Sequence, residues 1–183
     1  MVLTIIIIAV VLLLVVFFIA QYNGLVGARN LVDEAFSTMD VYLTKRFDLL
    51  PNLVATVKGY AKHECETLDK VMRHRSNVPE GDINGKVEAE AAISTAVRGL
   101  MVQVEAYPDL KANANFQDLQ HQMALLEEDI ASSRRYYNGT VREYNNKVQM
   151  FPGSLIAGMA NFTTRKMYEV ESAEVRRNVK VEF

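Results

Sequence analysis

The sequence predicts an all-α protein, in which a single N-terminal transmembrane helix continues into an elongated antiparallel bundle of about four long helices with a short helical C-terminal tail. Three observations predict this fold. Residues 5–20 carry no polar side chain, and long stretches without proline repeat apolar residues every three or four positions. No segment keeps the two-residue alternation of a half-buried strand.

The N-terminal run is long enough to cross a bilayer. Residues 2–20, at about 1.5 Å per residue, give roughly 28 Å of helix, close to the ~30 Å thickness of the hydrocarbon layer. A cleaved signal peptide would carry basic residues before the apolar run and small residues ahead of the cut. Residues 1–4 contain no Lys or Arg, and Phe18 is bulky. We therefore expect a retained single-pass anchor.

Basic residues near the span indicate its orientation. None precedes it, Arg29 follows it, and Lys45 and Arg46 come slightly beyond the usual counting window. This bias favours a soluble domain on the cytoplasmic side, and the difference between the two sides is about one basic residue. The opposite topology, with an extracytoplasmic domain, stays open.

The first bundle helix is expected to continue directly from the span, because only Gly24 and Gly27 interrupt the pattern. A second helix is expected to start near Pro51, where proline is tolerated in a first turn, and to end by about Asn77. Residues 77–85 are rich in turn formers and predict a loop.

An Ala-rich helix is expected from about Lys86 to the stop at Tyr107 and Pro108, and another from near Asn115 to Pro152. The last helix carries a seam with alternating steps of three and four, typical of a coiled-coil-like contact. Its members are Phe116, Leu119, Met123, Leu126, Ile130, Ser133, Tyr137, Val141, Tyr144 and Val148. The predicted division is a transmembrane helix at 1–21, a bundle at 22–151, and a tail at 152–183 that packs on the bundle or on a neighbour.

The histidines and the single cysteine do not form a recognisable catalytic or metal pattern. A di-iron bundle needs Glu-x-x-His pairs, which are missing at all 3 histidines. The cluster of His63, Glu64, Cys65 and Glu66 lacks the second histidine of a zinc-protease helix and is interpreted as a solvated surface. The sequence thus predicts that the protein is not an enzyme and has no cofactor and no small-molecule substrate. Its formal net charge of −2 predicts no nucleic-acid partner.

The most specific polar signal is the repeat Tyr-Asn-x-x-Val, which begins at Tyr22, Tyr137 and Tyr144. The last two copies lie seven residues apart on one helix face. One interpretation is a set of core tyrosines and asparagines that fix helix register, and the other is a contact surface for an identical chain. The candidate residues for either role are Tyr22, Asn23, Arg29, Arg135, Tyr137, Asn138, Arg142, Tyr144 and Asn145.

Several segments resemble one known family. They are Tyr22-Asn-Gly-Leu-Val-Gly-Ala-Arg-Asn30, Asp40-Val-Tyr-Leu-Thr-Lys-Arg-Phe-Asp-Leu-Leu-Pro-Asn-Leu-Val54, Lys58-Gly-Tyr-Ala61, Glu105-Ala-Tyr-Pro-Asp-Leu-Lys-Ala-Asn113, Arg135-Tyr-Tyr-Asn138, Tyr144-Asn145 and Phe151-Pro-Gly-Ser-Leu-Ile-Ala157. Together they resemble the LemA family over nearly the whole chain. The resemblance implies one N-terminal span, an elongated helical bundle and a place in the bacterial inner membrane, without an established enzymatic activity. Members linked to bacterial membrane compartments favour a scaffold by analogy only.

Two functions follow as expectations. The first is a membrane-anchored scaffold of the bacterial envelope that self-assembles through its long helices as a homo-oligomer. The second is an adaptor or regulator that binds another membrane protein, such as an envelope protease or sensor. The lipid bilayer is an expected partner in both.

Overall fold

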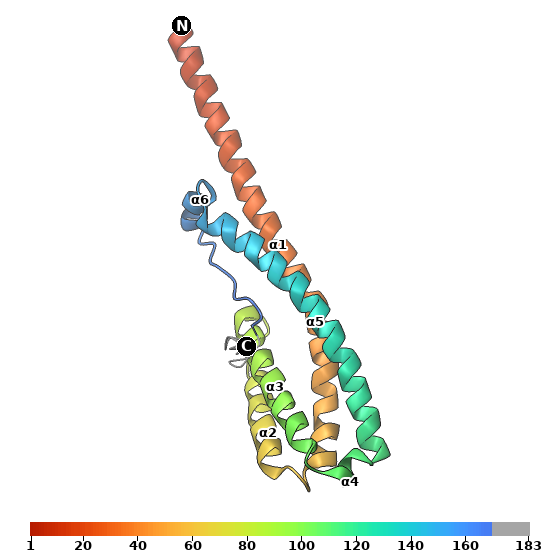
Figure 1. The fold of residues 1–183 in the computed structure, drawn as a ribbon. Coiled ribbons are helices and arrows are strands. Elements are labelled where there is room, and N and C mark those ends of the chain that lie inside the picture. Colours follow the sequence, from red (N-terminus) through yellow and green to blue (C-terminus); the bar gives the residue numbers. More distant parts are fainter. Residues whose placement is uncertain (170–183) are drawn as a thin grey trace, which may run out of the picture. The chain divides into compact units, whose positions relative to one another are not determined.

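The computed structural model describes residues 1–169 of the 183-residue chain. These residues form six helices and no strand, which confirms the all-α prediction for this part of the chain (Figure 1). The helices are α1 (Val2–Val57), α2 (Lys62–Ser76), α3 (Ile83–Val104), α4 (Pro108–Lys111), α5 (Ala114–Gln149) and α6 (Gly153–Met159). The predicted tail beyond residue 169 lies outside the described residues.

The chain divides into two compact units, and α1 and α5 each contribute to both. The first unit consists of residues 1–39 and 132–167. The second unit consists of residues 40–131 and continues from residue 168. Each unit has its own cluster of buried apolar residues.

α1 joins the apolar N-terminal run to the first bundle segment without a break, as predicted. All residues from 1 to 20 are exposed, and the most apolar part of α1 has a mean hydropathy of 3.6. Within residues 1–169, α1 is the one helix that is long and apolar enough to cross a membrane. It therefore contains a candidate membrane span.

The predicted helix start at Pro51 is wrong, because Pro51 lies inside α1 and the helix ends at Val57. A proline inside a helix costs about 3 kcal/mol. Four apolar side chains around it are buried in the core of the second unit, and each contributes about 1.5–3 kcal/mol, which offsets that cost. These side chains are Leu50, Leu53, Val54 and Val57. The break falls instead at residues 58–61, which include Gly59.

α3 begins at Ile83, three residues before the predicted start at Lys86. The reason is the N-cap at Asp82, whose Oδ1 accepts a hydrogen bond of 2.9 Å from the backbone N–H of Gly85. A side chain at position 85 would meet the Asp82 carboxylate, so glycine allows this close approach. The predicted loop is therefore shorter than residues 77–85.

The second unit packs its helical segments around one apolar core, with α2 and α3 side by side in Figure 1. The predicted seam supplies Phe116 and Met123 to this core. Cys65 is also buried, so its interpretation as part of a solvated surface is wrong. Cys65 precedes Leu68 by three residues, which places both on one face of α2.

In the first unit, α1 and α5 run antiparallel, as two contacts along them establish. The Phe36 and Tyr137 rings lie 5.9 Å apart, and the Lys147 amine lies 3.5 Å from the carbonyl oxygen of Gly24. α5 ends at Gln149, and a turn leads into α6. A Cβ on Gly153 would overlap the carbonyl oxygen of Lys147, so this turn requires glycine.

α6 is a short helix in the tail, and it ends in a Schellman motif. Asn161 has a φ of 56°, and the Phe162 N–H donates 2.9 Å back to the carbonyl of Ala157. The following residues, 162–169, are not helical. Backbone groups of Thr163, Arg165 and Lys166 bond instead to side chains of α5.

Candidate functional site

Three polar side chains of α5 hold the backbone of the tail, and we call Tyr137, Tyr144 and Asn145 the tail clamp. Asn145 Nδ2 donates to the carbonyl of Arg165 and its Oδ1 accepts from the Arg165 N–H, each at 2.9 Å. The Tyr144 hydroxyl donates to the carbonyl of Thr163 at 2.8 Å, and the Tyr137 hydroxyl donates to that of Lys166 at 2.9 Å. The clamp therefore provides hydrogen-bond partners for backbone groups of a segment that has no helical hydrogen bonds of its own.

α1 closes the other side of the same segment. The Phe162 ring meets the Tyr22 ring at 5.8 Å between centroids, and the Arg29 guanidinium lies 5.3 Å from the centroid of Phe162. Asp33 Oδ1 lies 3.4 Å from an Arg165 amino group. The tail residues are thus held between α1 and α5 within the first unit.

The structure brings five of the nine candidate residues together around the tail, namely Tyr22, Arg29, Tyr137, Tyr144 and Asn145. Asn138 is half-buried on α5. Asn23, Arg135 and Arg142 are exposed. The clamp hydrogen bonds run from α5 to the backbone of the tail. The register-fixing role and self-association through these nine residues both stay predictions.

Burial controls the chemistry of the clamp tyrosines. It raises the pKa of Tyr137 to about 12, although nearby Arg165 acts in the opposite direction. It also raises the pKa of Tyr144. Both hydroxyls are therefore neutral donors at physiological pH, which is the state that their carbonyl acceptors require.

The second unit contains an ion cluster with a buried centre, which sequence reasoning missed. Its members are Asp40, Arg46, Arg75, Lys86, Glu90 and Glu127. At its centre, Arg46 Nη2 lies 2.7 Å from Glu90 Oε2, and Arg46 Nη1 donates to Glu127 Oε1 at 2.8 Å and to Ser94 Oγ at 2.7 Å. The Ser94 hydroxyl also lies 2.9 Å from that of Tyr168. Arg46 thus connects α1, α3 and α5.

Arg75 of α2 extends the cluster. Its Nε donates to the second oxygen of Glu90, and its guanidinium lies 4.7 Å from the centroid of the Phe47 ring. Asp40 lies 3.7 Å from both Arg75 and Lys86. Three cations and three carboxylates therefore balance, and they join four helices of the second unit.

Burial by itself would lower the pKa of Arg46, but Tyr168, Glu90 and Glu127 raise it above its usual value. The guanidinium therefore stays charged. Its side chain and that of Glu90 are 0% and 1% exposed, whereas that of Glu127 is 41% exposed. Both carboxylate oxygens of Glu90 are occupied by guanidinium groups, so the arrangement is suited to holding helices together rather than to proton transfer.

The sequence did contain a signal for this cluster. Arg46 follows Leu43 by three residues and Glu90 follows Val87 by three, so both charges stand on the apolar faces of their helices. A charge at such a position needs a buried partner of opposite sign. Among residues 1–169, no group of three His, Cys, Asp or Glu side chains is arranged to hold a metal ion.

Asn145→Ala is expected to release the tail locally. It removes two hydrogen bonds to Arg165, each worth about 0.5–1.5 kcal/mol, so amide exchange at Arg165 should accelerate by roughly tenfold. Hydrogen exchange with mass spectrometry measures this. Asn146→Ala, at the adjacent exposed position, is the matched control. An equal rate of amide exchange at Arg165 in the two variants would contradict the role of Asn145 in the tail clamp.

Raising the pH is expected to destabilise the first unit through Tyr137. Its pKa in the folded protein, about 12, exceeds the ordinary value of 10. Its contribution to the free energy of unfolding is therefore complete below pH 10 and is lost as the pH rises through 12. Thermal unfolding followed by circular dichroism should show a falling midpoint in this range. The midpoint of Tyr137→Phe should fall less steeply with pH. An equally steep fall in this variant would contradict the role given to Tyr137.

Arg46→Met is expected to destabilise the second unit by about 3–5 kcal/mol, because it leaves buried polar partners without their cation. Glu127→Gln should cost at most about 1 kcal/mol, since that carboxylate is partly solvated and the amide still accepts. Denaturant unfolding of the full-length protein in detergent compares the two. A similar decrease in the free energy of unfolding in both variants would contradict a cluster centred on Arg46 and Glu90.

Known proteins match this chain over most of its length. Protein LemA of Metamycoplasma hominis is 26% identical over 163 residues, which cover 86% of this chain and 74% of that protein. Magnetosome proteins MamQ 1 and MamQ 2 of Paramagnetospirillum magneticum are each 21% identical over 180 residues, covering 84% of this chain and 66% of their own length. The model of the LemA family matches residues 35–183, which include the tail clamp and the ion cluster. The chain belongs to the LemA family.

Proposed function

We propose that this protein is a membrane-anchored helical scaffold of the bacterial envelope, which associates with copies of itself and has no catalytic role. The observation that carries the proposal is the continuity of α1, whose apolar segment leads into the bundle without a loop. A helix that enters the bilayer and also packs in the folded unit suits a tethering role. The LemA family is not a known enzyme family, which agrees with this proposal.

The self-association surface in this proposal is the exposed face of α5. On α5, the tail occupies Tyr137, Tyr144 and Asn145, and Asn138 is half-buried. The exposed candidates on this helix are Arg135 and Arg142. They stand seven residues apart, so both point the same way about 10 Å apart along the helix. Carboxylates of a second copy would be suitable partners for them.

The proposed location is the bacterial inner membrane, with the soluble part on the cytoplasmic side. Arg29, which follows the span, supports this orientation. Two relatives bear the name magnetosome protein, and this chain spans 66% of their length. From these two relatives, the proposal for this chain takes only the association with a membrane structure.

The test is the molar mass of the full-length protein in detergent, measured by light scattering. The unaltered protein should be an oligomer, and the double variant Arg135→Glu, Arg142→Glu should be smaller because it replaces the proposed contacts by repulsion. The double variant Arg73→Glu, Arg98→Glu reverses two exposed arginines of α2 and α3 and is the matched control.

Two results would overturn the proposal. A monomeric unaltered protein would exclude stable self-association under these conditions. A monomer that purifies with a different membrane protein would favour the adaptor or regulator in its place.

A further inference from the structure

A group of large apolar side chains remains exposed where α5 turns into α6. We define the apolar corner as Met150, Phe151, Leu155 and Met159. Their side chains are 64%, 79%, 57% and 78% exposed, respectively. Residues 150–164 contain no charged side chain. Such a cluster is unfavourable in water and indicates a contact surface.

The corner is fixed to the part of α1 that directly follows the apolar run. Ile156 and Ala157 on the other face of α6 pack against Leu25. Leu25 lies five residues after Ala20, which is about 7.5 Å along the helix. The interfacial layer on each side of the hydrocarbon is roughly 5–8 Å deep, so the corner lies at that level if α1 spans the bilayer.

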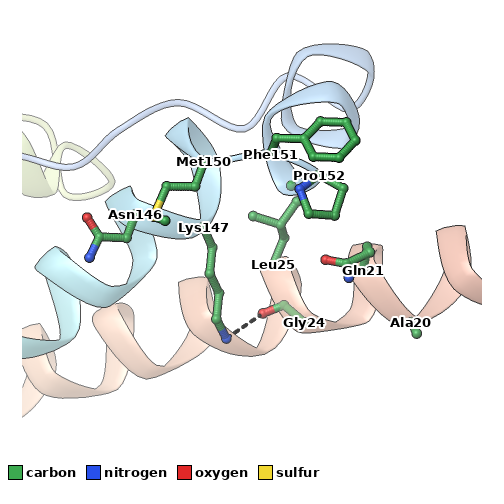
Figure 2. A pocket seen from close by; sticks show the side chains of 10 residues that line it. Ala20, Gln21, Gly24, Leu25, Asn146, Lys147, Met150, Phe151 and Pro152 are labelled. Carbon is green, nitrogen blue, oxygen red and sulfur yellow. Dashed lines mark hydrogen bonds between the residues drawn. The ribbon is translucent and has the colours of Figure 1, made fainter.

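Residues of the corner and of the end of the apolar run line one cavity of about 400 Å³. Figure 2 shows Met150 and Phe151 on one side of it and Ala20 and Gln21 of α1 on the other. The exposed Lys147 amine lies beside the same cavity, 3.5 Å from the carbonyl oxygen of Gly24. Apolar side chains next to a lysine are suited to the boundary between acyl chains and phosphate groups.

We infer that the apolar corner inserts into the interfacial layer of the same bilayer that α1 crosses. This inference rests on the proposed membrane anchor. The occupant is the bilayer because the corner continues the exposed apolar surface of residues 5–20 past Gln21. The corner then forms a second contact with lipid and limits the tilt of the first unit relative to the membrane surface.

The experiment uses the absence of tryptophan from the chain, which has 0 Trp. Phe151→Trp and Met159→Trp each introduce a single fluorophore at the corner of the full-length protein. The proteins are reconstituted into vesicles of phosphatidylcholine and phosphatidylglycerol. Phosphatidylcholine brominated near the glycerol end or near the middle of the acyl chain serves as the quencher.

Both corner variants should emit at shorter wavelength than a solvated tryptophan and lose most of their emission to the shallow quencher. The matched control is Tyr136→Trp, an exposed aromatic position on α5 in the same unit. It stands fourteen residues before Met150, about 21 Å along the helix, and beside the residue that contacts Phe36. It should keep its emission in both lipids.

Phe18→Trp, in the apolar run, separates the two proposals. If it is quenched while both corner variants behave as Tyr136→Trp does, the anchor stands and the corner inference is overturned. Short-wavelength emission from the corner without quenching also overturns it, because a second copy would then cover the corner. If Phe18→Trp is not quenched, the membrane anchor itself fails.

Discussion

The burial of one guanidinium group, that of Arg46, is the constraint on which the second unit depends. A buried cation is costly unless opposite charges and hydrogen-bond acceptors surround it. Here Glu90, Glu127 and Ser94 do so, and they come from two other helices. Arg75 adds α2 through the second oxygen of Glu90. Burial of apolar surface is non-directional, whereas these charge-assisted hydrogen bonds form only when the helices bring the paired atoms within reach of each other.

The first unit uses neutral polar groups for a similar purpose. Its tail segment is neither helix nor strand, so its backbone groups need partners from elsewhere. Tyr137, Tyr144 and the adjacent Asn145 of α5 supply them, with Tyr137 about two helical turns before the other two. Both units therefore rely on polar side chains at buried or half-buried positions, where an unpaired group would be expensive.

The apolar spacing was enough to predict the helices and the buried face of α5, because burial of one face is what stabilises an amphipathic helix. It could not locate the end of α1, since the residues around Pro51 gain more from burial than the proline costs. The tail conformation was also beyond local reasoning. It depends on contacts between Asn145 and Arg165, which are distant in the sequence. Arg46 and Glu90 could have been found by asking why charges stand on apolar helix faces.

The tail clamp recognises backbone atoms and not side chains. Its hydrogen bonds end on the carbonyls of Thr163, Arg165 and Lys166 and on one N–H, that of Arg165. Every amino acid except proline can offer those groups in an extended chain. The outward-facing side chains of Thr163 and Thr164 can consequently diverge without loosening the attachment, so the tail can acquire new surface chemistry while its path along α5 is preserved.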